Sequence, residues 1–186
     1  MDPVPEQLRS FVSVCVSLGS NLGDRAARLV AAVAALRATP GISGVVLSSV
    51  YETDPVGPPP QGPYLNAVAR FETSLAADVL LSRLLAIESE QARRRTPERC
   101  GPRTLDLDLL LFGDRTIREP GLVVPHPRLH RRAFVLEPLS EIAGTWVHPV
   151  LGETIAALAE RVRDPTAVRR LPGQGSEVGR LNTAAK

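Results

Sequence analysis

Two aspartates separated by a single residue are the feature of this sequence best suited to chemistry. Asp106 and Asp108 stand in the run TLDLDLLLF, 104–112, whose alternation is typical of a β-strand. Residues two apart in a strand point to the same face, so both carboxylates face one side and the alternating leucines face the core. Such carboxylates repel each other unless a cation neutralises them, and Mg²⁺ prefers oxygen ligands. The alternative is a solvent-facing strand with two ordinary aspartates, because this pair alone is a weak signal.

An arginine-rich segment lies directly upstream of the aspartates. Residues 93–103 (RRRTPERCGPR) contain five arginines, two prolines and a glycine, a composition that predicts a loop. Arginine binds phosphate bidentately, and an acidic pair with arginines is typical of magnesium-dependent phosphoryl transfer. A solvated charged loop or a nucleic-acid-binding patch is the alternative. The sequence has no G-x-x-x-x-G-K-[ST] motif, and its single lysine is Lys186, so it is not a P-loop enzyme.

The length and composition fit one folded domain. The chain has 186 residues, of which 44% are hydrophobic and 23% charged, and its formal net charge of +2 indicates neither nucleic-acid nor membrane binding. No apolar run reaches the length of a membrane span, and the first ten residues do not resemble a signal peptide. Cys15 and Cys100 lack the spacing of a metal or redox motif. We therefore expect a cytoplasmic protein.

Hydrophobic periodicity predicts the elements that must position these residues. The predicted strands are 11–17, 45–52, 64–73 and 104–112, and the predicted helices are 24–39, 74–90, 134–142 and 151–162. Asp24 is the expected N-cap of the first helix, and Thr73 or Ser74 that of the second. The order β-α-β-β-α-β predicts a ferredoxin-like α+β sandwich, with an antiparallel sheet covered on one face by two helices. We expect a single domain over 1–163 and a poorly packed tail over 164–186.

Several blocks of the sequence resemble the 6-hydroxymethyl-7,8-dihydropterin pyrophosphokinases of folate biosynthesis. The blocks are SLGSNLG at 17–23, YET at 51–53, YLNA at 64–67, RCGPRTLDLDLL at 99–110, VPHP at 124–127 and RAFVLEPL at 132–139. They follow the family's order from about residue 12 to residue 143. The resemblance implies transfer of a pyrophosphoryl group from ATP to the hydroxymethyl group of the pterin, with release of AMP (EC 2.7.6.3).

The resemblance also implies roles for charged residues. Asp106 and Asp108 match the aspartates that hold two Mg²⁺ ions, with ATP as co-substrate. Two bound ions would neutralise the transferred group and orient the in-line attack. Arg93 and Arg103 match the arginines expected to stabilise the transition state. The expected nucleotide contacts are Glu88, Arg95, Arg99, Leu109, His126 and Arg132.

For the pterin, the resemblance implies a ring held between two aromatic side chains. Tyr64 and Phe134 match these positions, and the amide of Asn66 supplies the donor and acceptor that read the ring edge. Cys100 stands where many members carry Trp, which helps to seal the pterin pocket, so we expect a looser enclosure here. The expected substrate contacts are Thr53, Val56, Tyr64, Asn66, Cys100 and Phe134.

Two functions from other classes are the alternatives. A ferredoxin-like domain with a basic loop can bind nucleic acid, although the predicted strands lack the aromatic pattern that stacks bases. A metal-dependent phosphohydrolase could use the same acids and arginines, but would have no need of the aromatic and amide residues. We expect small-molecule substrates, no nucleic-acid or membrane partner, and a monomer. Association with other folate-pathway enzymes is left open.

Overall fold

The computed structural model describes residues 10–55, 61–91 and 104–172, and the structural statements below refer to these ranges. Their centre is an antiparallel sheet with the spatial order β5-β1-β4-β3-β8, in which β2 also pairs with β4. The strands are β1 (Val12–Ser20), β2 (Ile42–Leu47), β3 (Tyr51–Thr53), β4 (Tyr64–Thr73), β5 (Asp106–Phe112) and β8 (Val168–Arg170). The long strands β1 and β4 lie at the centre of the sheet, so they place residues of three neighbouring strands side by side.

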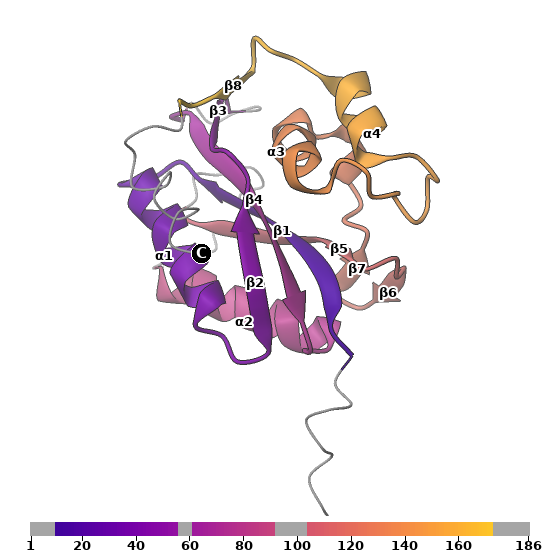
Figure 1. Cartoon of the computed structure of the whole chain (residues 1–186). Coiled ribbons are helices and arrows are strands. Elements are labelled where there is room, and N and C mark those ends of the chain that lie inside the picture. Colours follow the sequence, from indigo (N-terminus) through magenta and orange to yellow (C-terminus); the bar gives the residue numbers. More distant parts are fainter. Residues whose placement is uncertain (1–9, 56–60, 92–103, 173–186) are drawn as a thin grey trace, which may run out of the picture.

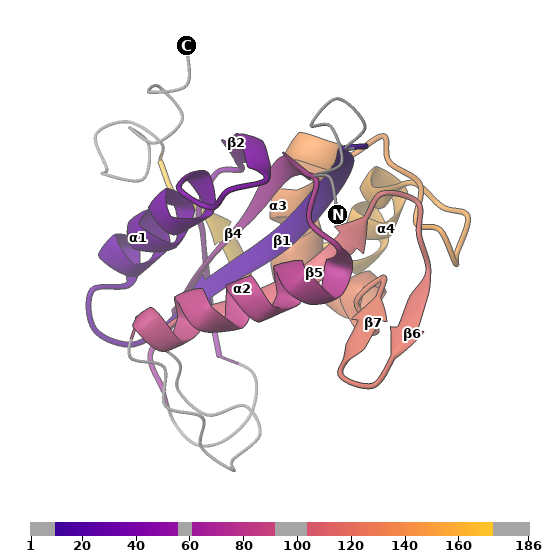
Figure 2. The ribbon, with the colours of Figure 1, turned by 90° about the horizontal axis from the view of Figure 1, so that it is seen from below.

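Helices cover both faces of this sheet (Figures 1 and 2). The remaining elements are α1 (Arg25–Arg37), α2 (Ala77–Glu90), β6 (Ile117–Glu119), β7 (Leu122–Val124), the 3₁₀ helix η2 (Leu129–Arg131), α3 (Ala133–Ala143) and α4 (Ile155–Val162). One core joins α1 and α2 to the sheet through residues such as Val16 and Leu18. A second core joins α3 and α4 to the opposite face through Cys15 and Val68.

The predicted α+β fold with an antiparallel sheet and helices packed on it is confirmed. The structure adds to this prediction, because α3 and α4 cover part of the face that the sequence pattern left open. Successive residues of β1 explain this arrangement: Val14, Cys15 and Val16 are all fully buried, so this part of the strand needs cover on both sides. Further along β1, Ser17 and Gly19 lie on the face of Cys15 and border a pocket instead of the second core.

Of the two predicted helix N-caps, one is found in the structure. Asp24 caps α1, where its Oδ1 accepts a hydrogen bond from the backbone N–H of Ala27 at 3.0 Å, as predicted. The predicted cap of α2 is wrong, because that helix begins later, after Ala76, and has no side-chain cap. Thr73 instead accepts from the N–H of Leu75 in the turn before the helix. A Thr or Ser can bond within a turn as readily as at a helix start.

The predicted strand 45–52 is two strands in the structure. Both β2 and β3 pair with β4, but Tyr51 is four residues after Leu47, whereas its partner Asn66 is three residues before Ala69. Ser48 bridges this irregularity, since its Oγ accepts from the N–H of Val68 at 2.9 Å. A one-residue shift of this kind changes which side chains of the strand point to each face of the sheet.

The segment after α4 also differs from expectation. Residues 164–172, which we expected to be poorly packed, include β8, which pairs with β3 at the edge of the sheet (Figure 1). Residues 173–186 lie outside the described ranges. Within those ranges, no helix has both the length and the apolar character needed to cross a membrane.

Candidate active site

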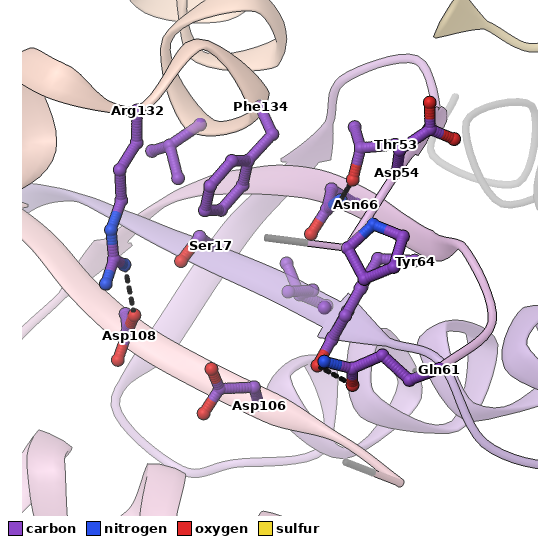
Figure 3. Close-up of a pocket in the computed structure, with 14 residues that line it drawn as sticks. Ser17, Thr53, Asp54, Gln61, Tyr64, Asn66, Asp106, Asp108, Arg132 and Phe134 are labelled. Atoms are coloured by element: carbon purple, nitrogen blue, oxygen red, sulfur yellow. Dashed lines mark hydrogen bonds and ion pairs between the residues drawn. The ribbon is translucent and has the colours of Figure 1, made fainter. Parts of the chain in front are cut away.

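A pocket opens on the part of the sheet that α3 and α4 leave uncovered (Figure 3). Its volume is about 140 Å³, close to the roughly 150 Å³ of an engineered cavity that binds benzene, so it suits a small flat ring. The lining residues come from β1, β3, β4, β5, the start of α3 and the segments beside them. They are Ser17, Leu18, Gly19, Thr53, Asp54, Pro55, Gln61, Tyr64, Asn66, Asp106, Asp108, Arg132, Phe134 and Val135.

Strand pairing brings the two chemically distinct ends of this pocket together. Gly19 on β1 pairs with Asn66 on one side and with Asp106 on the other, so the three residues form one row across three strands. A Cβ atom on Gly19 would lie 3.1 Å from the Asn66 amide oxygen. Ser17, two residues earlier, pairs with Asp108. The absence of a side chain at Gly19 therefore lets the amide and the carboxylates share one surface.

The alternation predicted for β5 is found. Leu105, Leu107 and Leu109 are buried in the core with α1 and α2, whereas Asp106 and Asp108 face the pocket. Glu88 of α2 is also buried, and its Oε1 accepts from the N–H of Leu107 at 2.7 Å. This bond fixes the backbone between the two aspartates. Glu88 and the side chain of Leu109, expected nucleotide contacts, thus lie on the core side of β5 and do not line the pocket.

Two basic residues converge on Asp108. Its Oδ2 is 3.1 Å from Nη1 of Arg132 and 3.7 Å from Nε2 of His126 (Figure 3 shows the arginine pair). Burial is the main cause that lowers the pKa of His126, and the neighbouring Asp108 opposes this shift. The Nδ1 of His126 accepts from the N–H of Arg128 at 3.1 Å, which leaves the proton of the neutral ring on Nε2, the atom nearest Asp108.

The other end of the pocket has no net charge, because Asp54 is paired with Arg169, and its other polar side chains are neutral and held by internal hydrogen bonds. The Asn66 amide is buried and donates to Oγ1 of Thr53 at 2.7 Å. The hydroxyl of Tyr64 donates to Oε1 of Gln61 at 3.1 Å, and the Asn21 amide donates to the same oxygen at 2.9 Å. Asn21 thereby connects the end of β1 to the residues that precede β4.

Two aromatic side chains border this uncharged end. Phe134 enters the pocket from the start of α3 and Tyr64 from β4 (Figure 3). The guanidinium carbon of Arg132 lies 5.6 Å from the centroid of the Phe134 ring, within the range of a cation–π contact. Arg132 therefore contacts both the acidic end, through Asp108, and the aromatic end.

The structure brings together seven of the residues that the sequence singled out, namely Thr53, Tyr64, Asn66, Asp106, Asp108, Arg132 and Phe134. His126 does not line the pocket, but it lies beside Asp108. Val56, Cys100 and the expected arginines at 93, 95, 99 and 103 lie outside the described residues.

Sequence reasoning missed several pocket residues, among them Ser17, Asp54 and Gln61. Ser17 and Gly19 stood in the SLGSNLG block, so that block was a usable signal. Its other polar members have structural roles: Ser20 donates to the carbonyl oxygen of Thr104 at 2.6 Å, just before β5.

Most of the chain matches one family of known proteins. Residues 15–144 match the family model described as 7,8-dihydro-6-hydroxymethylpterin-pyrophosphokinase (HPPK). A 2-amino-4-hydroxy-6-hydroxymethyldihydropteridine pyrophosphokinase of Synechocystis is 44% identical over 164 residues, which are 88% of this chain and 81% of the relative. The enzyme of the same name from Haemophilus influenzae is 40% identical over 87% of this chain and 100% of its own length.

Larger proteins also contain a similar region. The folic acid synthesis protein fol1 of Pneumocystis carinii is 40% identical over 82% of this chain, which spans 20% of that protein. A crystal structure of an HPPK-DHPS of Plasmodium falciparum matches with a TM-score of 0.65 at 15% identity, over 89% of this chain and 50% of the other, and supports the fold alone. The family-model match and the two relatives of similar length establish the identity: the chain belongs to the 7,8-dihydro-6-hydroxymethylpterin-pyrophosphokinase family.

Proposed function

We propose that the pocket on the open part of the sheet is where this pyrophosphokinase transfers the pyrophosphoryl group of ATP to 6-hydroxymethyl-7,8-dihydropterin. Family membership confirms the predicted reaction itself, a step of folate biosynthesis. The observation that supports the location is the row Asn66–Gly19–Asp106, which sets an amide suited to a pterin edge beside a carboxylate suited to a metal. The reacting hydroxymethyl group of a pterin bound at Asn66 would then point toward the acidic end.

The uncharged end suits the pterin. A flat ring between Tyr64 and Phe134 gains stacking and burial, and the amide of Asn66 gives orientation by pairing with the ring edge. Thr53 already accepts one N–H of Asn66, which fixes the orientation of the amide before any ligand binds. We assign the pterin to this end, with Thr53 as a positioning residue and Val56 and Cys100 as further contacts.

The acidic end suits Mg²⁺. Asp106 and Asp108 offer only carboxylate oxygens, the ligands this ion prefers, and Mg²⁺ is usually bound by one or two carboxylates together with substrate phosphates. We assign two ions to Asp106 and Asp108. Bound there, Mg²⁺ would supply charge neutralisation for the β- and γ-phosphates.

The residues around Asp108 suit the nucleotide phosphates. Arg132 carries a permanent charge, and the neutral His126 offers its Nε2–H as a donor without adding a second charge. We assign both to phosphate binding and positioning. Arg95 and Arg99 are proposed as further phosphate contacts, and Arg93 and Arg103 as donors that stabilise charge in the transition state. For Glu88 we propose positioning of β5 in place of direct nucleotide contact.

The product of the reaction, a pterin diphosphate, requires an enzyme that consumes it. Relatives named folic acid synthesis protein and folate synthesis bifunctional protein contain a region similar to this chain within a longer protein. We propose that the chain forms a single cytoplasmic pyrophosphokinase domain, expected over 1–163 and extended by β8 to include residues 164–172. Its proposed partners are small molecules and, by association, another enzyme of the folate pathway.

Nucleotide analysis tests the proposed function. The protein is incubated with ATP, Mg²⁺ and 6-hydroxymethyl-7,8-dihydropterin, and the nucleotides are resolved by anion-exchange chromatography. We expect AMP to form only when the pterin and Mg²⁺ are both present. ADP as the product would indicate an ordinary kinase, and AMP formed without pterin would indicate a phosphohydrolase; either result would contradict the proposal.

A further inference from the structure

The segment that follows α4 lies beyond residues 15–144, the part of the chain that matches the family model. It leaves α4 and crosses to the edge of the sheet, where β8 runs beside β3 (Figure 1). A turn at Asp164 starts this path, since its Oδ1 accepts from the N–H groups of Thr166 and Ala167 at 3.1 and 3.2 Å. We call residues 164–171 the edge segment.

The edge segment gives β3 a second neighbour. Three residue pairs join β8 to β3, and two further backbone bonds extend the contact: Asp54 N–H to Ala167 O at 3.4 Å and Leu171 N–H to Val50 O at 2.8 Å. Without them β3, three residues long, would be the edge of the sheet. This strand ends at Thr53 and is followed by Asp54, both of which line the pocket.

Arg169 contacts acidic residues at the end of β3. Its guanidinium contacts Asp54 through both terminal nitrogens, at 3.0 and 3.4 Å, and Nη2 lies 3.9 Å from Glu52. The same guanidinium donates to the carbonyl oxygen of Thr166 at 3.1 Å. Asp54 is thus held on the outer side of the pocket wall from two directions, by its backbone N–H and by its carboxylate.

Arg170 connects β3 to α3. Its Nε lies 3.2 Å from Glu141 near the end of α3, and two of its nitrogens donate to Ser49 Oγ at 2.9 and 2.7 Å. Glu141 in turn accepts from the Tyr51 hydroxyl at 2.8 Å and from the N–H of Ser49 at 2.6 Å. Because α3 begins with Ala133 and Phe134, this network fixes the aromatic wall of the pocket relative to the strand that ends at Thr53.

We propose that the edge segment is a positioning element for the pterin site. In this role, Arg169 and Arg170 set the distance between two sides of the pocket, one lined by Thr53 and Asp54 and the other by Phe134. The inference rests on the pterin assignment made above. Neither arginine touches the pocket, so both act through other residues. Such a role should appear in pterin affinity and leave ATP binding at the acidic end unchanged, since a pocket loses affinity when its walls are less well preorganised.

The test is the double substitution Arg169→Ala/Arg170→Ala in the full chain. Arg161→Ala is the matched control, because Arg161, in the last turn of α4, makes an ion pair of similar exposure with Glu153 at 3.0 Å. We expect KM for the pterin to rise about fivefold to tenfold, as for the loss of two exposed ion-pair contacts. The values of kcat and KM for ATP should stay within about twofold, and the control should match the wild type.

Two further measurements separate positioning from general destabilisation. The thermal midpoint of the double variant should stay within about 3 °C of the wild type, and Arg169→Lys/Arg170→Lys should restore part of the pterin affinity. Amide exchange at Asp54, whose N–H bonds to Ala167, should speed up only in the alanine variant. An unchanged pterin KM, or equal increases in both KM values, would overturn the inference. Failure of wild-type protein to turn over pterin would instead contradict the proposed function, whatever the exchange result.

Discussion

The two ends of the pocket are built on opposite principles. At the pterin end, Asn66 is paired with Thr53, Tyr64 with Gln61 and Asp54 with Arg169, so the polar groups carry no net charge and are fixed by partners within the protein. At the phosphate end, Asp106 and Asp108 bring two negative charges to one face, with Arg132 as the cation bonded to Asp108 among the described residues. The first end is organised mainly by neutral hydrogen bonds within the protein, whereas the second concentrates charged groups and so suits a bound cation.

This difference predicts a division of labour. A preorganised neutral site provides affinity and orientation, because little conformational freedom is lost on binding. A charged site provides stabilisation of developing charge, because its groups interact more strongly with the transition state than with the free substrate. Substitutions at the pterin end should therefore change binding, and those at the phosphate end should change turnover.

Asp108→Ala should have the largest effect. Loss of a metal ligand removes several kcal/mol of charge stabilisation, so we expect kcat to fall by about 10³-fold or more. Pterin binding in the absence of ATP, measured by calorimetry, should remain within about threefold of the wild type. Asp114→Ala, at an exposed position after the same strand, is the control. Near-normal turnover by the Asp108 variant would remove the metal assignment.

Arg132→Ala should have the second largest effect. It tests the residue that contacts both ends of the pocket. The loss of one charged donor from the phosphate end should lower kcat by about 10²-fold. The pterin affinity should fall by only about twofold to fivefold, because the cation–π contact with Phe134 is partly exposed. Arg118→Ala on β6, which is exposed, is the matched control in steady-state assays. A larger effect on pterin affinity than on kcat would reverse the proposed assignment.

Asn66→Ala should weaken pterin binding and leave ATP binding unchanged. Removing the amide leaves the edge of a bound pterin without its partner, which should weaken pterin binding by about tenfold to a hundredfold. ATP affinity should not change. Thr53→Ser keeps the hydroxyl that accepts from Asn66, so this variant should bind pterin nearly as well as the wild type. Equal losses of ATP and pterin affinity in Asn66→Ala would contradict a separate pterin end.

The smallest expected effect is a change in stability at acid pH. It involves His148, which does not line the pocket. Burial is the main cause that lowers the pKa of His148 from its ordinary value of 6.5, and nearby His130 lowers it further. The folded state therefore favours neutral His148, so its stabilisation is complete above pH 6.5 and is lost as the pH falls below that value. Urea unfolding at pH 7.5 and 5.5 should show a smaller loss for His148→Gln than for the wild type. An identical pH dependence in the two proteins would rule out this contribution.

The sequence predicted the parts of the site that depend on local pattern. The strand 64–73 has the predicted bounds, and the alternation around Asp106 and Asp108 correctly separates a buried face from a pocket face. Both follow from the period of two in a β-strand, which neighbouring elements do not alter. The cap at Asp24 is equally local.

What the sequence did not predict depends on contacts between distant segments. The shift at Ser48 exists because β2 and β3 share β4 as a partner. The pairing of β8 with β3 is accompanied by ion pairs of Arg169 with Asp54 and of Arg170 with Glu141, residues more than twenty-five positions away. Gln61 is part of the site through Asn21, forty residues earlier. Composition made the segment from 164 onward resemble a tail, because exposed ion pairs carry no hydrophobic periodicity.

One diffraction experiment tests the division of the pocket most directly. Crystals of the wild-type protein are grown with Mn²⁺ in place of Mg²⁺, a non-hydrolysable ATP analogue and 6-hydroxymethyl-7,8-dihydropterin, and anomalous scattering locates the manganese. We predict manganese at Asp106 and Asp108 and the pterin ring between Tyr64 and Phe134, with its edge on Asn66. Manganese at other residues, or a pterin bound outside this pair of aromatic side chains, would contradict the account.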